Sequence, residues 1–208
     1  MGWKHLESTL LQMKRNGFTP NRVFYNAILS AYVNYCQHID LDAIDLAMNA
    51  KKLLDETIQS SSSKNQKMTS YDANSFNLVI KCFLACSKNA NSSNNQSKGI
   101  SLFAAMDTFN LLNKSDIYSP NDQTYIHMFK ILQSTMRQDS KERTHVCESL
   151  FHQCCESGLL SNAVLRIVED ILPLSSTTMK RLTSCNSSGG SSLTVHTLPL
   201  EWSCNRRL

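Results

Sequence analysis

A short helical pattern that occurs three times constrains how this chain can fold. Each copy has an aromatic residue, an apolar pair at offsets three and four, and a large apolar residue at offset seven. These offsets place the four side chains on one side of a helix with about 3.6 residues per turn. The copies are Tyr25, Ile28, Leu29 and Tyr32; Phe76, Val79, Ile80 and Phe83; and Tyr125, Met128, Phe129 and Leu132. Three amphipathic helices of one kind are therefore predicted.

A second kind of apolar segment lies upstream of each turn. The segments contain Leu10, Leu11 and Met13; Ala47, Ala50, Leu53 and Leu54; and Ala105, Leu111 and Leu112. In the first turn, Gly17 ends a helix in the left-handed conformation and Pro20 cannot continue it. A unit of two helices and a turn cannot bury its apolar face alone. We therefore expect an all-α solenoid of antiparallel helical hairpins, with a concave side available for a partner.

The run Leu-Leu-Gln-Met-Lys-Arg-Asn-Gly-Phe-Thr-Pro-Asn from Leu10, followed by Val23 to Leu29, resembles the pentatricopeptide repeat. The resemblance extends from about Met1 to Leu132, and the Trp-Leu-Gly-Tyr pattern of tetratricopeptide repeats does not occur. It implies a right-handed α-solenoid that binds single-stranded RNA in a mitochondrion or plastid and contributes to RNA processing, stability or translation. A helical-repeat scaffold that binds other proteins is the alternative.

The spacing of the copies departs from this family. Tyr25, Phe76 and Tyr125 are 51 and 49 residues apart, whereas the repeat has about 35 residues, close to the tetratricopeptide period. Polar insertions at 60–67 and 87–98 account for the excess, and we expect them to loop out in disorder. The predicted divisions are 1–21, the second helix of a truncated repeat; 22–72, a repeat with a Ser-rich insertion; 73–121, a repeat with a Ser/Asn-rich insertion; 122–158, a third, degenerate repeat; 159–173, a capping helix; and 174–208, a flexible tail.

Composition favours a binding protein over an enzyme. The net charge of +4 mildly favours an anionic partner, and no apolar run is long enough for a membrane span. The eight cysteines form no Cys-x2-Cys pair, so we expect reduced thiols and no metal. No acidic cluster and no nucleophile with an oriented base is present. The sequence predicts no enzyme, no cofactor and no small-molecule substrate.

Candidate base-contacting residues follow from the family resemblance. It implies that the residue after the leading aromatic and the residue closing the same repeat contact one RNA base. Those pairs are Asn26 with Asp72, and Asn77 with Asn121. An Asn amide offers a donor and an acceptor to a base edge, and a closing Asp can orient the amide. By the same resemblance, the first pair favours uracil and the second a pyrimidine.

Two further positions and one alternative interpretation bear on these candidates. Asn21 would close the truncated repeat, and Ile126 holds the place of the amide in the third copy, where it cannot form a hydrogen bond. Asn21, Asp72 and Asn121 are equally suitable helix N-caps, so capping without any ligand stays open as an alternative.

The first residues show neither a secretory nor a transit-peptide pattern. They are typical of a second helix whose partner lies upstream, so we expect a fragment of a longer array. In the tail, Leu198, Leu200 and Trp202 are expected to pack on the last helices or to meet a partner.

Overall fold

A computed structural model describes residues 2–38, 43–62, 70–89, 95–172, 176, 178–180, 182 and 194–204. These residues include eight α-helices and two short 3-10 helices with defined bounds; residues 178–180 and 182 are also helical, and no strand occurs in the described part. The helices are α1 (Gly2–Arg15), α2 (Arg22–His38), α3 (Ala43–Ser62), α4 (Ala73–Asn89), α5 (Asn95–Asn113), α6 (Asp122–Thr135), α7 (Lys141–Glu156), α8 (Asn162–Ile171), η1 (Val195–Thr197) and η2 (Leu200–Trp202). They belong to two compact units, Met1–Ser119 and Pro120–Leu208. The all-α prediction is confirmed.

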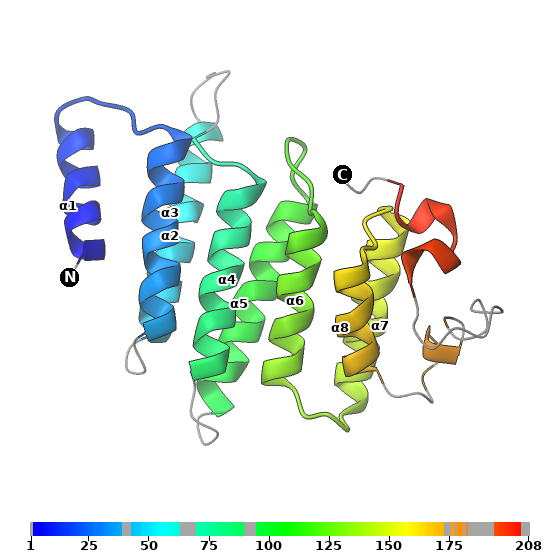
Figure 1. Cartoon of the computed structure of the whole chain (residues 1–208). Helices are drawn as coiled ribbons and strands as arrows, with labels where there is room; N and C mark the ends of the chain where they lie inside the picture. Colours follow the sequence, from blue (N-terminus) through cyan, green and yellow to red (C-terminus); the bar gives the residue numbers. More distant parts are fainter. Residues whose placement is uncertain are drawn as a thin grey trace. The chain divides into compact units, whose positions relative to one another are not determined.

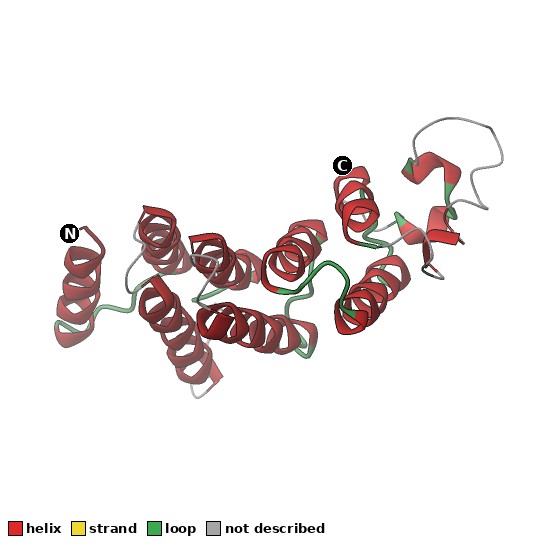
Figure 2. Cartoon of the chain, turned by 90° about the horizontal axis from the view of Figure 1, so that it is seen from below, coloured by secondary structure: helices red, strands yellow, loops and turns green. Residues whose placement is uncertain are grey.

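The first unit, Met1–Ser119, contains α1 to α5. Helices α2 and α4 lie side by side in one layer, and α3 and α5 lie behind them (Figure 1). Figure 2 shows the same helices approximately end-on. The predicted stripes of α2 and α4 are buried; they comprise Tyr25, Ile28, Leu29, Tyr32, Phe76, Val79, Ile80 and Phe83. Apolar burial of these repeated stripes therefore holds the first unit together.

The turn between α1 and α2 has the predicted glycine. Gly17 has a φ of 77°, and the N–H of Phe18 donates to the Met13 carbonyl oxygen at 2.9 Å. This bond closes the C-terminus of α1 in the pattern of a Schellman motif. An L side chain at Gly17 would be strained by this φ. The chain can therefore turn sharply from α1 into α2.

Both segments that were expected to be polar insertions overlap with helices. Helix α3 includes Ser60–Ser62, while α4 continues to Asn89 and α5 begins at Asn95. The prediction that 60–67 and 87–98 loop out is therefore wrong for 60–62, 87–89 and 95–98. Ser87 is buried and its hydroxyl donates to the Leu84 carbonyl at 2.8 Å. The Asn89 amide donates to the Cys36 carbonyl on α2 at 2.7 Å. These polar side chains satisfy backbone groups, which allows the helix to continue. Residues 63–67 and 90–94 lie outside the described part.

The second unit, Pro120–Leu208, contains α6, α7 and α8, with α6 packed on both of the others. The third predicted stripe is buried here: Tyr125, Met128, Phe129 and Leu132. The side chains of Asn121, Ser140 and Ser161 cap the three helices by accepting a backbone N–H three residues on. Gly158, with a φ of 67°, lies just past the end of α7. The predicted N-cap at Asn121 is confirmed for α6.

Part of the predicted flexible tail is ordered. Trp202 stacks edge-to-face on Phe151 of α7, with ring centroids 6.2 Å apart. The Leu160 N–H donates to the Trp202 carbonyl at 2.7 Å. Leu198 is buried, whereas Leu200 is 80% exposed. Residues 194–204 therefore pack on the last helices, as two of the three expected apolar side chains allow. A tail that is flexible throughout 174–208 is not what these residues show.

Candidate nucleic-acid interface

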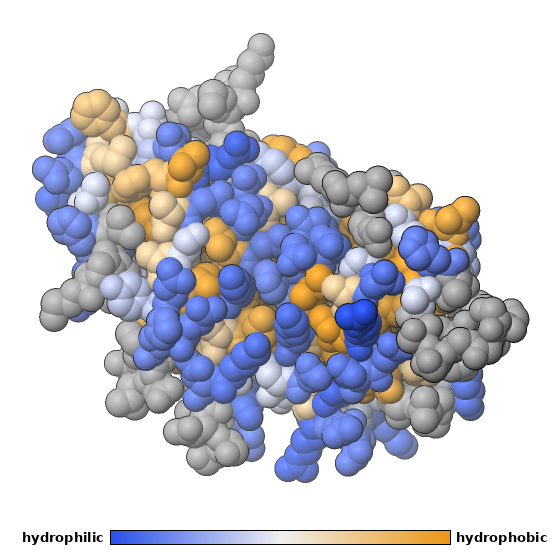
Figure 3. Space-filling view, in the orientation of Figure 1, coloured by the Kyte–Doolittle hydropathy of each residue, from blue (hydrophilic) through white to orange (hydrophobic). Residues whose placement is uncertain are grey.

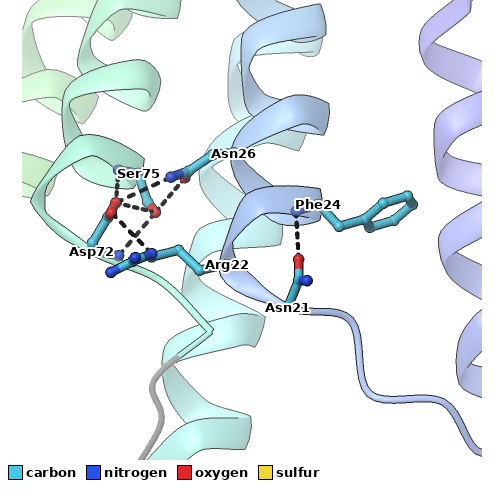
Figure 4. A network of polar contacts seen from close by, with 6 residues as sticks. All are labelled: Asn21, Arg22, Phe24, Asn26, Asp72 and Ser75. Atoms are coloured by element: carbon cyan, nitrogen blue, oxygen red, sulfur yellow. Dashed lines mark hydrogen bonds and ion pairs between the residues drawn. The ribbon is translucent and has the colours of Figure 1, made fainter.

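The predicted pair Asn26 and Asp72 is brought together in the first unit. Asn26 lies near the start of α2 and is half-buried, and Asp72 directly precedes α4. The Asn26 Nδ2 donates a hydrogen bond to the Asp72 Oδ1 at 3.2 Å (Figure 4). The contact joins the starts of two helices that carry the repeated stripe. It places the Asn26 amide at the edge between consecutive copies.

Ser75 completes this contact from the first turn of α4. Its hydroxyl donates to the Asn26 Oδ1 at 2.6 Å and lies 3.2 Å from the Asp72 Oδ1. A carboxylate can only accept, so the amide nitrogen of Asn26 must face Asp72. The amide oxygen then faces the Ser75 hydroxyl. Both ends of the amide are therefore engaged by the following helix start (Figure 4).

Asp72 also caps α4 and carries an ion pair. Its Oδ1 accepts the Ser75 N–H at 3.0 Å, and its own N–H donates to the Ser75 hydroxyl at 3.0 Å. The Arg22 Nε lies 3.4 Å from the Asp72 Oδ2, and the Arg22 side chain is 55% exposed. The pair neutralises part of the carboxylate charge beside the amide. Capping and amide contact are thus made by one side chain.

The other predicted residues have separate environments. The Asn21 Oδ1 accepts the Phe24 N–H at 2.9 Å and caps α2 (Figure 4). Asn121 forms a capping box with Thr124 at the start of α6. Asn77 is buried in the first unit and Ile126 in the second. Asn77 and Asn121 belong to different units, so their pairing stays a prediction.

Sequence reasoning missed Ser75 and Arg22 as members of this site. Asp72-x-x-Ser75 has the spacing of a capping box, which is a local signal that the two side chains meet. The contact between Ser75 and Asn26 spans 49 positions, and no local pattern indicates it. Arg22 is one of several basic residues near a helix start, and only the fold selects it.

Three thiols meet in the core of the first unit. Cys36 of α2 and Cys82 and Cys86 of α4 are all buried and reduced. The thiols of Cys36 and Cys86 both donate to the Ala43 carbonyl oxygen, at 3.6 Å and 3.0 Å. Across the described ranges, no group of three or more His, Cys, Asp or Glu side chains is placed to hold a metal ion. The sequence did not predict this clustering, because it depends on how α2 packs on α4.

The repeated stripes and the stacked helices define a helical repeat protein. The family model of the pentatricopeptide repeat domain matches residues 3–35, which span α1 and most of α2. The resemblance drawn from the sequence is confirmed over this stretch, and the copies that begin at Phe76 and Tyr125 lie beyond it. No curated protein and no solved structure matches the chain. None of the described helices is long and apolar enough to cross a membrane.

Proposed function

We propose that this protein binds single-stranded RNA along the starts of its repeated helices, with Asn26 and Asp72 at one base. The repeats form a right-handed solenoid of antiparallel hairpins in this proposal. The observation that carries it is the hydrogen bond between Asn26 and Asp72, because a fixed amide at a repeat edge can discriminate bases.

The chemistry of the site suits a base and a nearby phosphate. The Asn26 amide retains one N–H and one oxygen lone pair after its bonds to Asp72 and Ser75. Arg22 is half-exposed beside it, and its guanidinium has further N–H donors for an anion. Over α2 and α4, the visible face mixes hydrophilic side chains with smaller apolar areas (Figure 3).

The finer assignments rest on family resemblance. Asn26 with Asp72 favours uracil, and Asn77 with Asn121 favours a pyrimidine. Because this chain holds only about two complete repeats, we expect it to bind RNA weakly on its own. Binding in a mitochondrion or plastid would sequester or expose an RNA site for other factors, with no catalytic activity, cofactor or small-molecule substrate.

Base selection by the Asn26→Ala variant tests the proposal. Binding of short RNAs that differ in one base is measured beside Asn34→Ala, a change of an exposed amide on the same helix. We expect Asn26→Ala to lose the preference for uracil and Asn34→Ala to retain it. RNA binding by the wild-type protein should weaken steeply as the salt concentration rises, because the protein displaces counterions from the RNA phosphates when it binds. Unchanged base preference in Asn26→Ala would refute the assignment.

A protein-binding scaffold is the second candidate, and one observation favours it. Phe103 of α5 is 77% exposed and Met48 of α3 is 42% exposed, both on second helices of their repeats. Exposed apolar side chains of this size are enriched at protein interfaces. Absence of RNA binding at low salt, together with loss of a protein contact in Phe103→Ser, would favour this candidate over the first.

A further inference from the structure

We propose that Ser75 is a positioning residue that sets base selection by Asn26. In this view the unit that recognises one base is completed by the first turn of the next repeated helix. The inference rests on the proposed RNA-binding function. It assigns the specificity of Asn26 to two partners, Asp72 and Ser75, of which only Asp72 follows from the family resemblance.

The geometry gives Ser75 control of one end of the amide. Its hydroxyl donates to the Asn26 Oδ1 at 2.6 Å, which is shorter than the 3.2 Å bond from Asn26 to Asp72. Ser75 has no exposed surface, so it acts through Asn26 and does not itself meet a ligand. Turning the amide over would place its oxygen against the Asp72 carboxylate, which cannot donate, and would force the Ser75 hydroxyl to accept where it now donates. Without the hydroxyl, only Asp72 holds it.

The orientation of an amide decides which pyrimidine it fits. Uracil presents an N–H donor and a carbonyl acceptor where cytosine presents a ring-nitrogen acceptor and an amino donor. Turning the Asn26 amide over exchanges its own donor and acceptor, and so exchanges the preferred base. A locked amide therefore selects one pyrimidine, and a loosened amide accepts both. The Asp72 carboxylate sets which way the amide faces, and the Ser75 hydroxyl holds the amide oxygen in that orientation.

The sequence offers a comparison between the three helix starts. Asn121 and Thr124 have the same spacing as Asp72 and Ser75 and again supply a hydroxyl. Asn21 is followed at this spacing by Phe24, which has no donor in its side chain. A closing carboxylate and a hydroxyl at this spacing thus occur together at Asp72 and Ser75 and not at the other two helix starts.

Discrimination between uracil and cytosine tests the proposal. Dissociation constants are measured for two short RNAs that differ only by one uracil or cytosine, with wild type, Ser75→Ala and Ser75→Thr. We expect Ser75→Ala to lower the preference for uracil about three- to tenfold, the value of one hydrogen bond. Ser75→Thr keeps the hydroxyl and should keep the preference. Thr124 fills the equivalent buried place with its methyl group, so the larger side chain fits this kind of site.

Ser161→Ala is the control, because Ser161 is another buried serine whose hydroxyl serves a helix start, here as the N-cap of α8 in the second unit. It should lose stability and leave the uracil preference unchanged. A folded Ser75→Ala with full preference, while Asn26→Ala loses it, would overturn the role of Ser75 alone. If wild type binds neither RNA, the proposed function itself fails. If Ser75→Ala does not fold, Ser75→Cys provides the same comparison, since a thiol is a weaker donor of similar size.

Discussion

Asn26 and Asp72 lie 46 positions apart in the chain, yet the amide of the first donates to the carboxylate of the second at 3.2 Å. The oxygen that accepts this bond also accepts the first-turn N–H of Ser75 at 3.0 Å. The Asp72 carboxylate thus links the start of α4 to the Asn26 side chain on α2. Helix capping and base contact, which were alternatives at the level of sequence, are compatible at this residue.

The Asp72→Asn variant separates these two roles. Asn caps a helix about as well as Asp, so we expect the free energy of unfolding to change by less than about 1 kcal/mol. The new amide can face Asn26 with either its donor or its acceptor, so the Asn26 orientation is no longer fixed. Preference for uracil should relax toward either pyrimidine, as measured by RNA titration. Chemical denaturation gives the stability, and Asp72→Ala, which removes the cap, should cost about 1 kcal/mol more.

A second prediction concerns the link between α1 and α2. The hydroxyl of Tyr32, a fully buried side chain, donates to the Glu7 carboxylate on α1. Burial, and next the bond to Glu7, raise the pKa of Tyr32. Tyr32→Phe removes the donor, and we expect a loss of about 1 kcal/mol and faster amide hydrogen exchange in α1. Glu7→Gln keeps an acceptor and should cost less; an equal or larger loss would contradict the assigned bond.

A third prediction concerns the packing of residues 194–204. Trp202 is half-buried and stacks on Phe151 at an interplanar angle of 88°. We expect Trp202→Ala to lower the free energy of unfolding by about 1–2 kcal/mol, because it loses this aromatic pair and part of its buried area. Trp202→Phe retains a ring and should lose less. Denaturation of the 208-residue chain provides the measurement, and an unchanged stability in Trp202→Ala would contradict the contribution of this aromatic pair.

Local sequence patterns predict the helices of this fold. The features they do not predict depend on contacts between helices. The start of α6 follows from Asn121 and Thr124, whose spacing is a capping signal. The continuation of α4 through Ser87 does not, because a buried serine in a helix depends on neighbours that cover it. In the site, the place of Asn26 in the repeat predicts it as a base-contacting residue. The hydroxyl of Ser75 that holds it comes from another helix.

Alkaline pH should destabilise the second unit through Tyr125. Burial raises the pKa of this fully buried phenol from about 10 to about 12. The folded state therefore binds its proton more tightly than the unfolded state does. The resulting stabilisation is complete below pH 10 and is lost as the pH rises toward 12, by about 2 kcal/mol. Tyr125→Phe removes this titration, so its free energy of unfolding should fall less steeply over that range in denaturation at several pH values. Cys147, whose pKa burial also raises to about 12, titrates in both proteins, so parallel slopes would contradict the prediction for Tyr125.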